Sequence, residues 1–274
     1  MKVTEAFKKG KPTLSFEFFP PKSRDQEKKL FEVIAQLKKF DPDFVSVTYG
    51  AMGTTREKTF FWVNEIKHKY GLEPVAHLTC VASTGDDISR QLEELEKMGV
   101  ENILALRGDP PEGQAGFIPP ANGFKLAKEL ISFIKKRKPS FCLGCAGFPE
   151  GHPGAPSLTA DTDYLKQKID AGAEYVITQL FFDNRYYFDF VKRCGKAGIK
   201  VPIIPGLMPI TNLKQIKRIT EVCGATIPGD LKIGAEHTLS QARELLKIGV
   251  PGLHFFVMNQ AEPISSILTQ VFPR

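Results

Sequence analysis

The sequence predicts an α/β fold in which residues 1–274 form a single closed (β/α)8 barrel, also called a TIM barrel. Short apolar runs, rich in β-branched and aromatic residues, alternate with amphipathic helical stretches along the whole chain, and no change in composition marks a domain boundary. The alternative, an open doubly wound sheet, needs a glycine-rich phosphate turn after the first strand. Pro20-Pro21 stands there instead, so we favour the barrel.

The elements follow from apolar runs and their spacing. Strands are expected near 13–19, 43–49, 73–79, 102–107, 141–146, 174–181, 201–205 and 252–258. Helices are expected after them, near 25–39, 56–69, 86–98, 122–137, 160–171, 185–197, 211–223 and 261–271, with one more at 238–248. Ser23 or Asp25 is expected to cap the first helix, and Asp86 or Asp87 the third. Four glycines follow helices where a left-handed residue is wanted: Gly71, Gly99, Gly172 and Gly198.

Composition favours a soluble, cytoplasmic protein. Hydrophobic residues make up 42% of the chain and charged residues 25%, which are ordinary values for a soluble protein. No run of about 18 apolar residues is present, and the N-terminus lacks a signal-peptide core, so we expect no membrane partner. Five scattered cysteines fit a reducing compartment.

The net charge of +6 suits small anionic ligands rather than nucleic acid. The only basic cluster, Lys135-Lys136-Arg137-Lys138, ends a predicted helix, where cations suit the helix dipole. It has no interleaved aromatic residues of the kind that bind nucleic acid. We therefore expect no nucleic-acid partner.

Glu17 is the most informative residue, because it is a carboxylate within an aromatic run. Phe16, Phe18 and Phe19 surround it in the first predicted strand. Burial disfavours the ionised form, so the pKa of Glu17 is expected to rise, as a general acid requires. The alternative is a glutamate that reaches solvent or pairs with a lysine. Strand alternation puts Ser15 and Glu17 on one face and Phe16 and Phe18 on the other.

Other polar residues gather where the predicted strands end, which is where (β/α)8 enzymes carry their chemistry. Going round the barrel, the strand-end segments that carry them contain Thr48, Tyr49 and Ala51; His77 and Thr79; Arg107, Gly108 and Asp109; Phe148 to His152; Thr178 and Gln179; and Asn259 and Gln260. Arg107 and Asp109 share strand parity, so both can face the barrel mouth, or they can simply pair with each other. Together these groups predict a site on one rim.

Several of these residues have ordinary structural alternatives. His77 and Gln179 can be hydrogen-bonded core residues. His152, in a loop of proline and glycine, can be either functional or a surface residue. Asp161 and Lys168 lie on a predicted helix, where exposure is the usual explanation.

Metal binding and nucleophilic catalysis find no support. Cys142 and Cys145 lie within one predicted strand and on its opposite faces, unlike a zinc knuckle or a redox pair, so we interpret both as packed thiols. No G-x-S-x-G motif is present, and no cysteine has a plausible base beside it. We expect no metal.

Motifs along nearly the whole chain resemble the methylenetetrahydrofolate reductase family. They are Phe16-Glu17-Phe18-Phe19-Pro20-Pro21, Ser46-Val47-Thr48-Tyr49-Gly50-Ala51, Leu106-Arg107-Gly108-Asp109, Ile177-Thr178-Gln179 and Ile204-Pro205-Gly206. The resemblance implies a barrel that binds FAD and reduces 5,10-methylenetetrahydrofolate to 5-methyltetrahydrofolate, a step of one-carbon metabolism that supplies methionine biosynthesis. Because the chain ends where the barrel ends, it resembles the short bacterial form.

The resemblance also implies roles for matching residues. Glu17 would protonate the bridging nitrogen of the substrate, and Asp109 would lie near the pterin and the flavin. Gln179, Gln215 and Gln260 would bind folate. The FAD site would comprise Thr48, Tyr49, Ala51, His77, Arg107, Gly108, Asp109, Ala121, Phe148, His152, Ala155, Asp161, Tyr164 and Lys168.

Some positions depart from the family pattern. Phe148 stands where a tyrosine is common, Tyr164 and Gln167 where asparagine and arginine are expected, and Gln260 where an arginine is expected. The segment 223–237 is also shorter than in the commonest form. NADH or NADPH is the expected electron donor, and a homo-oligomer is expected. These departures leave open an alternative to the reductase: a flavin- or pterin-binding subunit that is active only within a larger electron-transfer or methyl-transfer complex. A third option is a folate methyltransferase barrel that contains no flavin.

Overall fold

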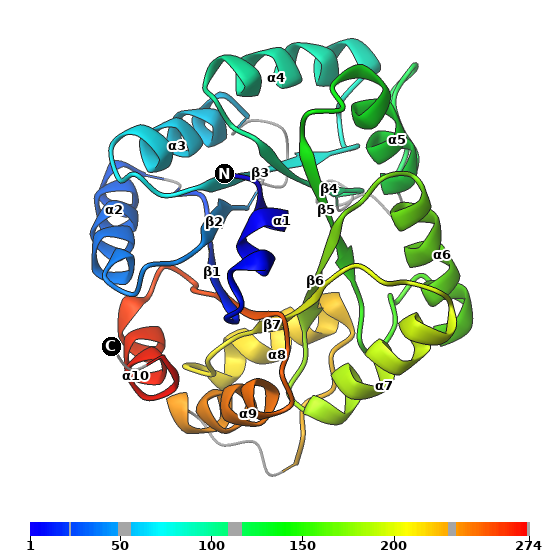
Figure 1. The fold of residues 1–274 in the computed structure, drawn as a ribbon. Coiled ribbons are helices and arrows are strands. Elements are labelled where there is room, and N and C mark those ends of the chain that lie inside the picture. The colour runs from blue at the N-terminus through cyan, green and yellow to red at the C-terminus, as the bar shows by residue number, and fades with distance from the viewer. Residues whose placement is uncertain (22, 49–55, 109–116, 230–233, 273–274) are drawn as a thin grey trace.

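Eight parallel strands close into a barrel in chain order, with β8 pairing back to β1. The computed structural model describes residues 1–21, 23–48, 56–108, 117–229 and 234–272, without the side chains of 56–58, 213, 215 and 218. Helices ring the strands, and the view down the barrel shows helix and strand alternating round the circle (Figure 1). The (β/α)8 prediction is confirmed.

The strands lie close to their predicted places. They are β1 Thr13–Phe18, β2 Phe44–Val47, β3 Pro74–Thr79, β4 Asn102–Leu106, β5 Cys142–Gly147, β6 Tyr175–Leu180, β7 Ile203–Leu207 and β8 Gly252–Phe256. The helices are α1 Val3–Ala6, the 3-10 turn η1 Phe7–Lys9, α2 Arg24–Lys38, α3 Arg56–His68, α4 Gly85–Lys97, α5 Ala127–Arg137, α6 Leu158–Asp170, α7 Asn184–Lys196, α8 Leu213–Cys223, α9 Ala235–Lys247 and α10 Ala261–Val271. In the described part of the chain, no helix has the length and apolar character needed to cross a membrane.

Three local expectations need correction. Helix α5 begins at Ala127 rather than near 122, because Asn122 is left-handed (φ 59°) and the Gly123 N–H closes a turn on the Pro120 carbonyl at 2.9 Å. Helix α4 is capped by Thr84, whose hydroxyl accepts from the Asp87 N–H at 3.2 Å, so neither predicted aspartate is the cap. The short α1 and η1 were not predicted. Ser23 does cap α2, and the four predicted glycines all have positive φ.

Strand alternation separates the two larger of the three apolar clusters found among the described residues. Phe16 and Phe18 belong to the large outer core between the strands and the helices. An inner core fills the barrel itself and consists of Val3, Phe44, Val75, Leu104, Cys142, Tyr175, Ile177 and Ile204. Cys142 belongs to the inner core and Cys145 to the outer one, which confirms that the two thiols lie on opposite faces and are packed.

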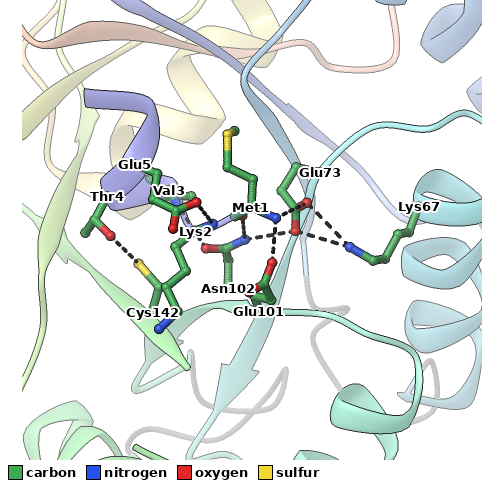
Figure 2. A network of polar contacts seen from close by, with 10 residues as sticks. All are labelled: Met1, Lys2, Val3, Thr4, Glu5, Lys67, Glu73, Glu101, Asn102 and Cys142. Carbon is green, nitrogen blue, oxygen red and sulfur yellow. Dashed lines mark hydrogen bonds and ion pairs between the residues drawn. The ribbon is translucent and has the colours of Figure 1, made fainter. Parts of the chain in front are cut away.

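The amino-terminal residues close one end of the barrel. In Figure 1 helix α1 lies in the middle of the ring, and Val3 and Ala6 are fully buried. Figure 2 shows the contacts that hold it, centred on Asn102 at the start of β4. Its side chain accepts from the Val3 N–H at 2.8 Å and donates to the Met1 carbonyl at 2.9 Å. Because these contacts are made where the strands begin, the opposite, carboxyl end of the strands is left for a site.

Replacing Asn102 by alanine should lower the free energy of unfolding by about 2 kcal/mol, because the buried Val3 N–H would lose its acceptor. Urea unfolding measures the change. Asn64→Ala, at a half-buried position on α3, is the matched control and should change stability by less than about 0.5 kcal/mol. Equal stability of Asn102→Ala and the wild type would contradict the account of this end of the barrel.

Candidate active site

A layer of polar side chains lies inside the barrel above the inner core, towards the carboxyl ends of the strands. This polar layer consists of Ser15, Glu17, Ser46, His77, Thr79 and His254, all of them buried. The strand register brings them together, since Glu17 is the partner of Ser46, and Ser15 is the partner of His254. A barrel interior ordinarily filled by branched apolar residues therefore carries a carboxylate and two imidazoles at this level.

Glu17 is at the centre of the polar layer and only 8% exposed. Its Oε1 accepts a hydrogen bond from the Thr48 hydroxyl at 2.9 Å. Its Oε2 lies 3.5 Å from His77 Nε2 and 3.5 Å from His254 Nε2, within the range of an ion pair. The carboxylate points into the barrel, as strand parity predicts, and among the described residues its charged partners are histidines rather than a lysine.

The expected rise in the pKa of Glu17 is wrong for this structure. Burial alone would raise the pKa, but His77, His254 and the Thr48 hydroxyl outweigh it and hold the pKa at about 2. His77 contributes most to lowering the pKa of Glu17, followed by His254 and then by the Thr48 hydroxyl. Burial also lowers the pKa of His77 itself. These neighbours come from other strands, which a single strand's sequence does not reveal.

His254 was missed from the sequence. It is fully buried on β8, and its Nδ1 lies 2.9 Å from the Ser15 hydroxyl. The Ser15 hydroxyl also donates to the Leu253 carbonyl at 3.3 Å. The signal was present, because a histidine in an apolar strand had already singled out His77.

The end of β6 approaches the end of β7 very closely. The Thr178 hydroxyl accepts from the Gly206 N–H at 2.9 Å, beside an irregularity in the pairing of the two strands. A Cβ at Gly206 would lie 2.4 Å from the Thr178 carbonyl, so only glycine fits there. The neighbouring Gln179 is half-buried, and its Oε1 accepts from the Leu180 N–H at 2.8 Å.

A second group of polar side chains lies at the end of β5 and the start of α6. The rings of Phe148 and His152 meet edge to face with centroids 4.7 Å apart, and His152 Nδ1 accepts from the Gly154 N–H at 2.8 Å. Asp161 is buried, which raises the pKa of its carboxyl against the attraction of Lys168. Lys168 donates to the Ala146 carbonyl in β5. The structure thus brings these four predicted residues into one region.

Arg107 and Gly108 follow β4 directly. Arg107 Nε donates to the Gly108 carbonyl at 3.4 Å. Gly108 has a φ of 81°, and a Cβ there would lie 2.6 Å from Val81, so the chain needs glycine at this turn. The predicted Arg107–Asp109 pair stays untested because Asp109 lies outside the described residues.

Comparison with known proteins identifies the family. A family model described as methylenetetrahydrofolate reductase matches residues 2–272. The 5,10-methylenetetrahydrofolate reductase of Escherichia coli strain K12 is 37% identical over 268 residues, covering 92% of this chain and 88% of that protein. The chain belongs to the methylenetetrahydrofolate reductase family. The resemblance carried by the sequence motifs is confirmed.

Other members of the reductase family are longer. The probable methylenetetrahydrofolate reductase (NADH) of Oryza sativa subsp. japonica is 35% identical over 292 residues, covering 97% of this chain but 49% of the rice protein. The chain thus spans about half the length of this relative. Among solved structures, a Clostridium thermocellum protein described as binding two copies of 5-methyl-5,6,7,8-tetrahydrofolic acid has a TM-score of 0.70 at 16% identity, covering 98% of this chain and 97% of the other. That likeness concerns the fold alone.

The described residues fit a flavin dinucleotide of the kind this family uses. His77 Nδ1, on the side of the ring away from Glu17, and the Thr79 hydroxyl are buried without a hydrogen-bond partner among the described residues. Buried polar groups are seldom left so unless a ligand or water completes them. Lys168 and the ring of His152 add the cationic and polar groups that phosphates need.

Some of the remaining predicted site residues lie outside the described part of the chain, and the others differ in how far they are exposed. Tyr49, Ala51 and Asp109 lie outside the described residues, as does the side chain of Gln215 on α8. Ala121 is exposed in the turn before α5, Ala155 is half-buried, Tyr164 is half exposed on α6, and Gln260 is exposed at the start of α10. The structure therefore leaves their proposed roles as predictions.

Acid should weaken the wild type more than Glu17→Gln. Glu17 has a pKa of 4.5 when unfolded and about 2 when folded, so its contribution to stability, at most about 3 kcal/mol, is present above pH 4.5 and lost as the pH falls towards 2. Urea unfolding at about pH 5 and about pH 3 measures the difference. Glu93→Gln, at an exposed site on α4, should be as acid-sensitive as the wild type. Equal acid sensitivity of Glu17→Gln and the wild type would contradict the assignment.

Proposed function

We propose that this chain reduces 5,10-methylenetetrahydrofolate to 5-methyltetrahydrofolate with FAD as its cofactor. The observation that carries the proposal is the buried Glu17 carboxylate, held by Thr48 and two imidazoles at the carboxyl end of a (β/α)8 barrel. The reductase relatives at 35–37% identity support it.

Glu17 is the group that delivers a proton to the substrate. Opening the five-membered ring of methylenetetrahydrofolate breaks a carbon–nitrogen bond, and the nitrogen must be protonated as the bond breaks. Glu17 lies at the mouth end of the barrel with its carboxyl group among donors, so a proton can reach it from within the protein. Asp109, three residues after the last residue of β4 in the sequence, is proposed to orient the pterin and favour the cationic intermediate.

The cofactor and the folate are proposed to occupy neighbouring parts of the rim. Bound FAD would supply the two-electron chemistry, accepting hydride from NADH or NADPH and passing it to the folate carbon. His77, Arg107, His152 and Lys168 would hold it. Gln179, Gln215 and Gln260 would bind folate. NADH is the donor that we favour, since the rice and maize relatives carry NADH in their names. A homo-oligomer, a single domain and a cytoplasmic location stay predictions.

One observation favours a second candidate, a flavin-binding subunit that works only with a partner protein. Gln167, where the family pattern has arginine, accepts a hydrogen bond from Lys128 at 2.6 Å and so is turned towards α5. Gln260 makes no side-chain cap bond to α10. If Gln167 and Gln260 bind flavin or folate more weakly than the arginines of the family pattern, a partner protein would have to complete the site before turnover occurs.

Anaerobic mixing of the FAD-loaded chain with 5-methyltetrahydrofolate tests the function. Loss of the visible absorbance of the flavin is expected, because the reaction run backwards transfers hydride from the methyl group. Retention of the absorbance with FAD bound would favour the partner-dependent subunit. Failure to bind FAD would overturn the proposal and return the folate methyltransferase to consideration.

Glu17→Gln should retain FAD and be reduced by NADH at the wild-type rate, but reoxidation by methylenetetrahydrofolate should slow by about 10²–10⁴-fold, the usual loss for a general acid. Stopped-flow absorbance separates the two half-reactions. Glu93→Gln is the control and should match the wild type in both. Reoxidation of the flavin by methylenetetrahydrofolate at the wild-type rate in Glu17→Gln would contradict the proposed role of Glu17.

A further inference from the structure

His254 and His77 lie equally far from Glu17, but they differ in the hydrogen-bond partner of the ring nitrogen that faces away from it. Both Nε2 atoms are 3.5 Å from Glu17 Oε2. The far nitrogen of His77 has no hydrogen-bond partner among the described residues. The far nitrogen of His254 lies 2.9 Å from the Ser15 hydroxyl. The two rings are therefore suited to different protonation states.

The Ser15 hydroxyl favours a proton on His254 Nδ1. Its own hydrogen is directed to the Leu253 carbonyl at 3.3 Å, so its oxygen is free to accept from Nδ1–H. With Nδ1 protonated, a neutral ring would turn the lone pair of Nε2 towards the Glu17 carboxylate. A second proton on Nε2 removes that repulsion, and each N–H of the imidazolium then faces an acceptor.

We propose that His254 is a positioning residue that holds, as an imidazolium between Ser15 and Glu17, the proton that Glu17 delivers to the substrate. This inference rests on the proposed reduction of methylenetetrahydrofolate. His254 would give the ionised Glu17 carboxylate a source of protons inside the barrel, because the inner core and α1 close the other end. The titratable groups that face His254 are Glu17 from β1 and His77 from β3.

The proton transfer balances without another reactant. Glu17 gives a proton to the bridging nitrogen, the carbon–nitrogen bond breaks, and its electron pair stays on that nitrogen. Because Glu17 begins as a carboxylate, it first accepts this proton from His254 Nε2, and it is a carboxylate again once the proton has passed to the nitrogen. The imidazolium has become a neutral ring protonated on Nδ1, and water restores its second proton after the product leaves.

Magnetic resonance of the histidine rings in the purified full-length chain, labelled with nitrogen-15, tests this assignment without measuring turnover. The chain has five histidines, so each ring can be assigned by substitution. His254 is expected to carry protons on both nitrogens in the wild type and only on Nδ1 in Glu17→Gln, because the carboxylate that faces Nε2 is gone. A neutral His254 ring in the wild type, or a ring that stays protonated on both nitrogens in Glu17→Gln, would overturn the proposal.

Kinetics of the folate half-reaction give the second test. A glutamine at position 254 can donate a hydrogen bond but cannot give up a proton, so His254→Gln is expected to slow kcat for folate reduction by about 10²-fold or more and to change its pH profile, with KM for folate little changed. Ser15→Ala keeps the ring and should shift the same pH profile. His68→Gln, an exposed histidine on α3, is the control.

These outcomes separate this inference from the proposed function. Wild-type folate kinetics in both His254→Gln and Ser15→Ala would overturn the role of His254 while leaving the reductase function intact. A wild type that never exchanges hydride with folate would overturn the function, and the ring titration would still report the protonation of His254. If His254→Gln does not fold, the titration of Glu17→Gln and the kinetics of Ser15→Ala decide.

Discussion

A carboxylate enclosed by a barrel has to be surrounded by hydrogen-bond donors, and the rest of this site follows from that requirement. Glu17 is placed inside by the alternation of β1, which sends Phe16 and Phe18 to the outer core. Thr48, His77 and His254 then supply the donors from three other parts of the ring. The same contacts that make the buried charge tolerable also give it a route for protons.

The two ends of the barrel differ in the side chains that fill them. Where the strands begin, aromatic and aliphatic side chains of the inner core and helix α1 fill the interior, and Asn102 ties the amino-terminal segment to β4 (Figure 2). Where the strands end, the side chains become polar, and the loops after β4 and β5 carry the residues that suit phosphates. The proposed substrate chemistry therefore has one end of the barrel available to it, the end that carries the active site in other barrels of this kind.

Patterns local in sequence predicted the fold well, and contacts between distant strands account for the errors. Period-two alternation placed Glu17 inside the barrel, and apolar runs placed the strands within a few residues. The direction of its pKa shift was wrong because burial was visible in the sequence, whereas the approach of His254 on β8 was not. The start of α5 was placed too early because the left-handed Asn122 breaks a pattern that otherwise reads as helical.

A crystal structure of Glu17→Gln with FAD and methylenetetrahydrofolate bound tests the central claim most directly, because it locates the reacting nitrogen relative to residue 17. The account predicts that the bridging nitrogen lies within about 3.2 Å of the substituted side chain at position 17, or one water molecule away, at the end of the polar layer nearest Thr48. A folate bound with that nitrogen turned away from residue 17 would contradict it.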